Sequence, residues 1–126
     1  MWIRAPASSF RASAMTDRIV EIRLYKLKPG VRDAFREVAK NSVEMLGRHG
    51  ITVVGHGPSA HDADSYFLMR AYPSIEEREK MLAGFYGSEE WETRFNATVM
   101  GMIETFNTVV LEATDPAIAA LAKLGV

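Results

Sequence analysis

Residues 18–27 alternate between two kinds of side chain, which is the pattern of a β-strand with two different faces. The alternating positions are Val20, Ile22 and Leu24 on one face and Glu21, Arg23 and Tyr25 on the other. Pro29 and Gly30 end the strand, because proline offers no N–H to a neighbouring strand and glycine favours a turn. The polar face need not be solvated, since a glutamate, an arginine and a tyrosine side by side could also line a cavity.

Two later stretches have the apolar spacing of an amphipathic helix. The first begins at Val31 and is expected to end at His49 and Gly50, with the glycine in the left-handed position of a helix cap. The second begins near residue 75, because Ser74 and Glu77 form the pattern of a capping box. Two glycines interrupt this second helix and a serine restarts it: Gly84, Gly87 and Ser88.

Three further strands complete the predicted fold, at about residues 51–56, 65–72 and 104–113. The order β-α-β-β-α-β is that of the ferredoxin-like α+β fold, a four-stranded antiparallel sheet with both helices on one face. The polar side of the first strand would then lie opposite the helices. Alternate residues of the other strands would share that face: Thr52, Val54, His56, Tyr66, Leu68, Arg70, Tyr72, Phe106, Thr108 and Val110. So many aromatic and aliphatic side chains predict that this face pairs with a second copy of the chain in a homodimer.

The first residues differ in composition from the rest. The segment MWIRAPASSFRASA contains two arginines and three serines, but no acid and no long apolar run. It has the features of an organellar transit peptide, and equally those of a tail before an internal start. We expect residues 1–16 to be a disordered extension, 17–114 the folded domain, and 115–126 a short C-terminal helix or tail.

Composition excludes several classes of function. The formal net charge of −1 argues against nucleic acid, which usually requires a basic excess. No apolar run reaches the roughly 18 residues that span a bilayer. The chain has no cysteine, which excludes disulfides, thiolate nucleophiles and cysteine-bound zinc. We therefore expect a cytoplasmic protein, or one of an organelle matrix if the first residues are a transit peptide.

Several segments resemble the NIPSNAP family. Residues 19–30 (IVEIRLYKLKPG) resemble the family pattern Y-E-x-R-x-Y-x-L-K-P-G, with Ile19 where an aromatic residue often stands. The similarity continues through residues 46–51, 71–79 and 88–91, in the same order. The resemblance implies a dimeric α/β barrel, in which two ferredoxin-like sheets face each other around a lumen. It implies no settled reaction, because the family has none.

Five polar residues are candidates for a site in that lumen: Glu21, Arg23, Tyr25, His56 and Arg70. In the functional interpretation, Arg23 binds an anionic or carbonyl oxygen and Tyr25 donates a hydrogen bond. Glu21 is then a possible base, and His56 transfers a proton. In the structural interpretation, Glu21 forms a buried ion pair with Arg23 or Arg70 and merely supports the fold. Trp91 and Phe95, spaced as one helical face, are expected in the core.

No cofactor is expected. His61, Asp62 and Asp64 follow a Gly-Pro-Ser turn, but their spacing matches no metal site, so we expect no metal. Related haem-degrading barrels supply a histidine ligand from a helix, and residues 75–102 contain no histidine.

Three functions remain open at this point. The first is a NIPSNAP-like dimer of undefined activity that binds a small apolar-aromatic molecule in the lumen. The second is a cofactor-independent monooxygenase or isomerase acting on a phenolic or acyl substrate. The third is an interaction module that presents its helices to a protein partner.

Overall fold

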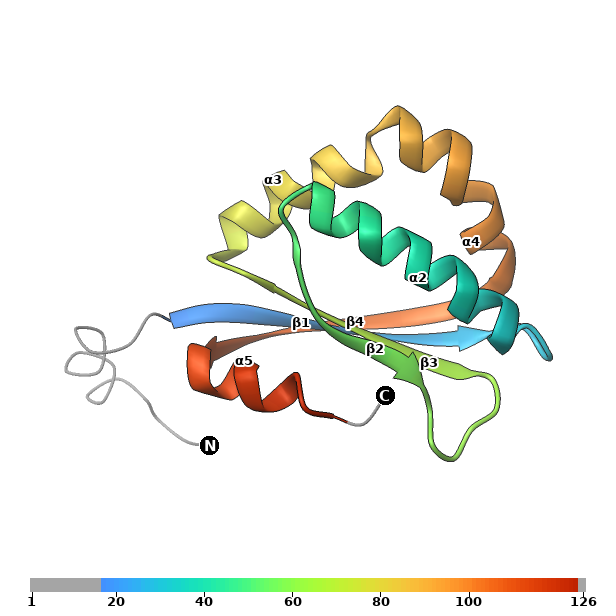
Figure 1. The fold of residues 1–126 in the computed structure, drawn as a ribbon, viewed down its shortest axis with the longest axis horizontal. Helices are drawn as coiled ribbons and strands as arrows, with labels where there is room; N and C mark the ends of the chain where they lie inside the picture. The colour runs from blue at the N-terminus through green and yellow to red at the C-terminus, as the bar shows by residue number, and fades with distance from the viewer. Residues whose placement is uncertain (1–16, 125–126) are drawn as a thin grey trace.

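A sheet of four antiparallel strands, in the order β2-β3-β1-β4, is the centre of the molecule. The computed structural model describes residues 17–124. Its elements are β1 (Asp17–Leu27), α2 (Arg32–Arg48), β2 (Thr52–Pro58), β3 (Ser65–Tyr72), α3 (Ile75–Tyr86), a π-helical segment η1 (Trp91–Asn96), α4 (Ala97–Met102), β4 (Ile103–Thr114) and α5 (Asp115–Leu121). Helices α2, α3 and α4 cover one face and α5 lies on the other (Figure 1). This is the predicted ferredoxin-like α+β arrangement.

Helix α2 covers the sheet with one apolar side, as its spacing predicts. Its buried side chains are Phe35, Met45 and Leu46. The helix ends at the predicted cap, where Gly50 has a φ of 77°, in the left-handed region that favours glycine. The N–H of Ile51 then donates to the carbonyl of Leu46 at 3.0 Å and leads the chain back into the sheet.

The second helical connection, between β3 and β4, is interrupted once, at Gly87. Helix α3 begins at the predicted cap, where the hydroxyl of Ser74 accepts from the N–H of Glu77 at 3.1 Å. The helix passes through Gly84, so an interruption there was wrongly predicted. At Gly87 a Cβ would lie 2.7 Å from the carbonyl oxygen of Ala83, so only glycine fits without a shift. The π-helical segment η1 then follows, a rare form that often lies at functional sites.

The two faces of the sheet are opposite to the predicted ones. Tyr25 and Leu27 pack with Phe35 of α2, so the odd positions of β1, including Glu21 and Arg23, face helices α2–α4. The even positions face α5: Val20 packs with Ile118, and Ile22 packs against that cluster. The prediction failed because it took polar residues as a sign of the face without helices. Glu21 is polar but 0% exposed, since arginines neutralise it under the helices.

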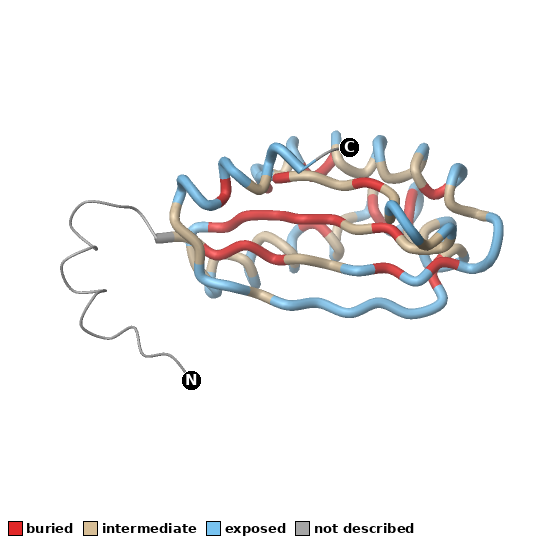
Figure 2. The backbone as a smooth tube through the Cα atoms, turned by 90° about the horizontal axis from the view of Figure 1, so that it is seen from below, coloured by how far each residue is buried: buried red, intermediate tan, exposed pale blue. Residues whose placement is uncertain are grey.

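Part of the second face remains open. The side chains of Leu24, Val109 and Leu111 are 53%, 46% and 46% exposed on the side of α5, which covers only one end of the sheet. Figure 2 shows the burial of the inner strands and the exposure of the edge strand β4. The predicted apolar open face therefore exists, but different residues form it. Tyr25, Leu68, Phe106 and Val110 are absent from it.

A β-bulge in β2 also changes the predicted face of several residues. Val53 pairs with Arg70, His56 pairs with Leu68, and Val54 is the extra residue between them. Val53 and His56 therefore point to the helices. Thr52 and Val54 point to the α5 side, where Val54 packs with Met69. Thr52, Val54 and His56 were predicted to share the face of Glu21, and of the three only His56 lies there.

Among residues 17–124, no helix is long and apolar enough to cross a membrane. The predicted extension at residues 1–16 lies outside the described residues.

Candidate functional site

Ion pairs and hydrogen bonds join Glu21 to β3 and α3 beneath the helices. Glu21 and Arg70 are direct cross-strand partners, with Arg70 Nε donating to Glu21 Oε1 at 2.5 Å. Arg78, in α3, places Nη2 at 2.7 Å from Glu21 Oε2. Arg23 lies farther away, at 3.9 Å. The hydroxyl of Tyr72 also donates to Glu21 at 3.3 Å.

These arginines keep Glu21 ionised. Burial alone would raise the pKa of Glu21, but Arg70, with help from Arg78 and Arg23, brings it below the ordinary value of 4.5. A carboxylate held by two close guanidiniums is a poor proton acceptor. Glu21 is thus part of a buried ionic network, as the structural interpretation expects, and is not placed to act as a base.

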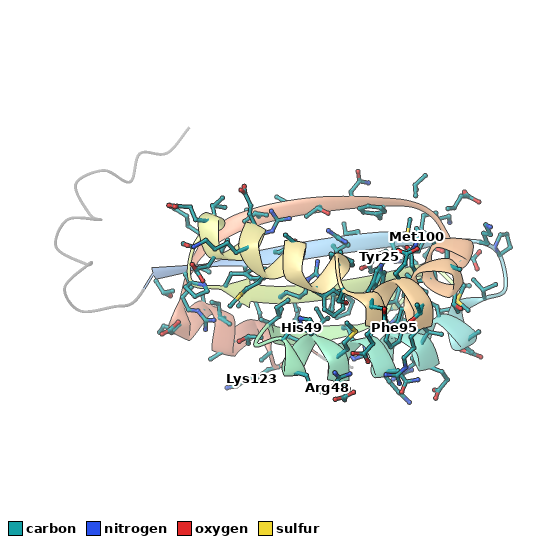
Figure 3. The ribbon with its side chains drawn as sticks, turned by 90° about the horizontal axis from the view of Figure 1, so that it is seen from above. Tyr25, Arg48, His49, Phe95, Met100 and Lys123 are labelled. Atoms are coloured by element: carbon teal, nitrogen blue, oxygen red, sulfur yellow. The ribbon has the colours of Figure 1, made fainter. Side chains whose placement is uncertain are left out.

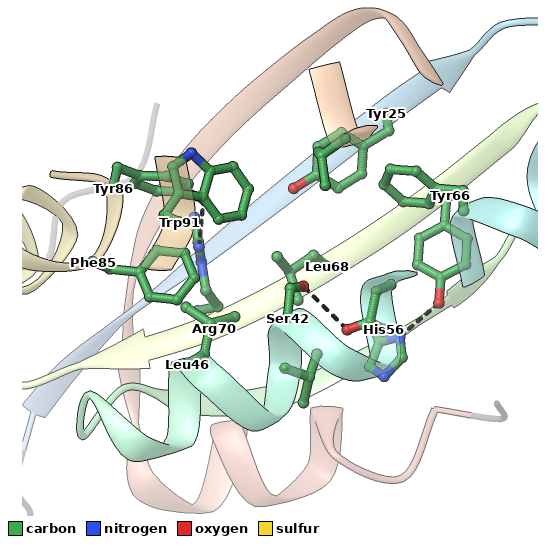
Figure 4. A pocket seen from close by; sticks show the side chains of 14 residues that line it. Tyr25, Ser42, Leu46, His56, Tyr66, Leu68, Arg70, Phe85, Tyr86 and Trp91 are labelled. Carbon is green, nitrogen blue, oxygen red and sulfur yellow. Dashed lines mark hydrogen bonds between the residues drawn. The ribbon is translucent and has the colours of Figure 1, made fainter. Parts of the chain in front are cut away.

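His56 forms a second polar pair with Tyr66. Its Nδ1 lies 2.6 Å from the hydroxyl of Tyr66, and the dashed line in Figure 4 marks this hydrogen bond. Burial lowers the pKa of His56 below its ordinary value of 6.5, and the charges of Arg36 and Lys40 lower it further. The imidazole is therefore neutral at neutral pH.

A small cavity lies between the sheet and the helices. Its volume is about 40 Å³, and Tyr25, His56, Tyr66 and Arg70 supply its polar lining from the strands. Figure 4 shows these side chains together with Tyr86 and Trp91 from the second helical connection. A space of this size holds a few water molecules but is far smaller than the roughly 150 Å³ that accommodates benzene.

A larger groove adjoins this cavity at the edge of the sheet. It has a volume of about 460 Å³ and lies between β4, the end of β1 and the segments η1 and α4. The cavity and the groove share four lining residues: Tyr25, Tyr86, Trp91 and Val99. Figure 3, seen from the helix side, shows Tyr25 and Met100 together at this end of the molecule. Arg23 and Phe106 complete the groove on the strand side.

Arg23 is the positively charged group of the groove, and Glu92 of η1 is its acidic group. Its side chain is 15% exposed, its Nε donates to Thr108 Oγ1 at 3.2 Å, and its guanidinium lies 4.9 Å from the centre of the Phe106 ring. Tyr25 lies beside it. Burial, and to a lesser degree the neighbouring Tyr86, raises the pKa of Tyr25 to about 12, so its hydroxyl keeps its proton and can donate. The groove thus combines an aromatic wall with a cation and a hydroxyl donor.

All five predicted site residues lie on one side of the sheet. Glu21, Arg23 and Arg70 share the ionic network, Tyr25, His56 and Arg70 line the cavity, and Arg23 and Tyr25 line the groove. Their place under the helices, however, is not the predicted lumen between two sheets. Sequence reasoning missed Tyr86 and Arg78 and assigned Trp91 to the core alone. Gly87 was the available signal for Tyr86, because a glycine at that position predicts the end of the helix and so places Tyr86 in its last turn.

The loop between β2 and β3 is a hydrogen-bonded turn. Asp62 accepts from the N–H of Asp64 at 2.9 Å and from the hydroxyl of Ser65 at 2.7 Å, and Ser59 accepts from the N–H of His61 at 3.2 Å. Within the described part of the chain, no three His, Asp or Glu side chains are grouped as a metal site would require.

A second groove, of about 580 Å³, crosses the α5 face. It is mainly apolar, with Lys26 and His61 at its polar end. Its apolar lining comes from two strands and the end of the chain: Ile22, Leu24, Phe67, Met69, Leu121 and Leu124. This groove continues the open apolar surface formed by Val109 and Leu111.

The four-stranded antiparallel sheet and the two helical connections that cover one of its faces define a ferredoxin-like α+β domain. The family model NIPSNAP matches residues 20–116, which is most of the chain, and the chain belongs to that family. No curated protein matches the chain.

Solved structures of bacterial proteins have the same fold. A NIPSNAP family protein with unknown function from Agrobacterium tumefaciens is 22% identical with a TM-score of 0.71, over 77% of this chain and 88% of its own. An uncharacterised NIPSNAP domain protein from Burkholderia xenovorans is 17% identical with a TM-score of 0.67, over 74% and 91%. A Nitrosomonas europaea protein provisionally named an antibiotic biosynthesis monooxygenase is 20% identical with a TM-score of 0.63, over 82% and 95%. At these identities, the likeness concerns the fold alone.

Proposed function

We propose that this NIPSNAP-family protein binds a small apolar-aromatic molecule in the groove beside β4, beneath its helices. The observation that carries the proposal is the groove of about 460 Å³, which combines aromatic side chains with the largely buried cation of Arg23. Small-molecule sites usually have this character, a mainly apolar wall with few orienting polar groups. The π-helical segment η1, which supplies Trp91 to the wall, supports a functional role for this edge.

We propose binding rather than catalysis because the groups suited to chemistry lie in the smaller space. His56 is the group best suited to accept a proton, but the cavity beside it measures only about 40 Å³. Glu21 is engaged by arginines. A cofactor-independent monooxygenase or isomerase would need a substrate next to one of these groups. The alternative of a pure interaction module leaves the groove and its buried cation without a role.

We further propose that the protein is a homodimer paired through the α5 face of the sheet. The open apolar side chains of Leu24, Val109 and Leu111 form a continuous surface with the second groove, and two-fold pairing would bury it. In such a dimer the ligand groove stays outside the interface, on the other face. The absence of cysteine suits the reducing cytoplasm, where we propose that the dimer works.

The test uses two aromatic probes of nearly the same shape, 2-naphthoate and its neutral analogue 2-naphthamide, in isothermal titration calorimetry with the full chain. We expect at least one of them to bind with a Kd below about 100 μM. Phe106→Ala, which removes an aromatic wall of the groove, should weaken that binding about tenfold or more. The matched control is Val109→Ala on the opposite face of the same strand, which should bind as the unaltered chain does. Absence of binding by both probes, or equal loss in both variants, contradicts the proposal.

A further inference from the structure

The hydroxyl of Tyr86 lies between two arginines. Arg70 Nη1 donates to it at 3.0 Å and Arg23 Nη1 donates to it at 3.4 Å. The phenolic oxygen thus accepts two hydrogen bonds from cations, as an oxygen of a carboxylate does when it binds arginine. Arg70 comes from β3 and Arg23 from β1, so the sheet offers two donors at one point above its surface.

Tyr86 also stands between the cavity and the groove. Its ring lines both spaces and packs edge-on against Phe85 and Trp91, each at a centroid distance of 4.9 Å. Figure 4 shows Tyr86 and Trp91 above Arg70. Tyr86 is one of four residues that line both the cavity of about 40 Å³ and the groove of about 460 Å³, and it is the one whose hydroxyl both arginines hold. Tyr86 is the last residue of α3, and Gly87 follows it before Trp91 of η1 packs against its ring.

The charge beneath Tyr86 favours an anion. Three guanidiniums, those of Arg23, Arg70 and Arg78, surround the single carboxylate of Glu21. Arg70 is 0% exposed and lines the cavity, yet its Nη2 has no hydrogen-bond partner among the described residues. A fully buried cationic donor without a partner is costly, and an anionic oxygen in the cavity would satisfy it.

We infer that the ligand of this site is an aromatic carboxylate, and that the Tyr86 hydroxyl occupies the position of its carboxylate oxygen in the free protein. The inference rests on the proposed binding function and specifies its ligand class. On binding, the Tyr86 side chain turns away, and the carboxylate takes the hydrogen bonds of Arg23 and Arg70 while the aromatic body stays in the groove. Tyr86 therefore acts as a specificity-determining gate, because only a ligand that replaces its oxygen satisfies both arginines.

The experiment compares the two naphthalene probes on the unaltered chain and on Tyr86→Phe. We expect 2-naphthoate to bind about tenfold or more tightly than 2-naphthamide. Tyr86→Phe keeps the ring but removes the competing oxygen, so the affinity for 2-naphthoate should rise about threefold or more, while that for 2-naphthamide stays within about twofold. The matched control is Tyr72→Phe, which removes another phenol of the same ionic network but lines neither space. It should leave both affinities unchanged.

A second variant keeps the inference testable if Tyr86→Phe is unstable. Arg23→Gln removes one of the two donors to the Tyr86 oxygen, at a side chain that is partly exposed, and should abolish the preference for 2-naphthoate. Equal binding of both probes by the unaltered chain, or a loss of 2-naphthoate affinity in Tyr86→Phe, would overturn the inference and leave the proposed binding site standing. If neither probe binds at all, the proposed function itself fails.

Discussion

The two faces of the sheet differ in the kind of side chain that they bury. The face under α2–α4 encloses charged groups, with Glu21 and Arg70 both 0% exposed in its centre. The α5 face contains mostly apolar side chains, and yet Leu24 and Leu111 remain about half exposed there. Polarity therefore does not decide which face lies inside. A polar residue can be buried if its partners come with it, and an apolar residue can stay outside if another molecule covers it.

The sharpest test of this comparison removes the buried carboxylate. Glu21→Gln keeps the shape of the side chain but leaves the guanidiniums of Arg70 and Arg78 without their counter-charge. We expect the free energy of unfolding to fall by about 3–5 kcal/mol, because a buried charge that loses its partner is strongly destabilising. Urea unfolding at neutral pH measures this change in the free energy of unfolding. Glu44→Gln, in the exposed pair with Arg48, is the control and should change stability little. Similar stability of both variants would show that the network contributes nothing.

The same network predicts a dependence on pH. The pKa of Glu21 in the folded protein lies below the ordinary value of 4.5, so its stabilising contribution is present above that value and is lost as the pH falls through the folded pKa. The difference in stability between the unaltered chain and Glu21→Gln should therefore be largest near neutral pH and narrow below about pH 4. Urea midpoints measured for both proteins from neutral to about pH 3 would show it. A difference that is constant over this range would contradict it.

The second test adds a charge to the apolar face. Leu24→Glu places a carboxylate at the centre of the proposed dimer surface, where it would be desolvated without a partner. We expect the dimer to weaken at least about a hundredfold while the fold persists. Sedimentation equilibrium at several concentrations measures this change. Ile75→Glu, at a similarly exposed apolar residue on the helix side, should leave the assembly unchanged. If the unaltered chain is a monomer at micromolar concentration, the pairing proposal fails.

The smallest expected effects come from the helix caps of the two faces. Ser74 caps α3, which holds Arg78 over Glu21, and Thr114 caps α5 on the other face. Ser74→Ala should cost about 1 kcal/mol, and Thr114→Ala about half of that, because its bond to Ala117 is longer, at 3.3 Å, and exposed. Thermal unfolding of the two single variants compares them directly. A larger loss of stability from Thr114→Ala than from Ser74→Ala would contradict this order.

The order and type of the elements could be predicted because local signals determine them. Alternation in β1, the capping residues of α3 and the glycine cap after α2 all act within a few residues, and the structure has each of them. The orientation of the sheet could not be predicted in this way. It depends on Arg70 and Arg78, which lie far from Glu21 in the sequence and neutralise it only once the chain has folded.

The candidate site shows the same limit. Alternation correctly placed Glu21, Arg23 and Tyr25 side by side, because neighbours on one strand face are fixed by the strand itself. Alternation could not reveal Tyr86, since its partners Arg23 and Arg70 come from two other elements. His56 was correctly grouped with Glu21, Arg23 and Tyr25 on one face of the sheet, but the regular alternation assumed for β2 was wrong. Strict alternation from Val53, which truly faces the helices, would have turned His56 away from them.

The position of His56 shows how the bulge in β2 lets the strand change in length during evolution. Val54 is the one residue of β2 without its own partner in β3, so a chain that lacked it would keep both Val53 opposite Arg70 and His56 opposite Leu68. Gain or loss of a single codon at this position would therefore change the length of the strand while the imidazole stayed in place. In an alignment with a relative that is one residue shorter here, the gap therefore belongs at Val54.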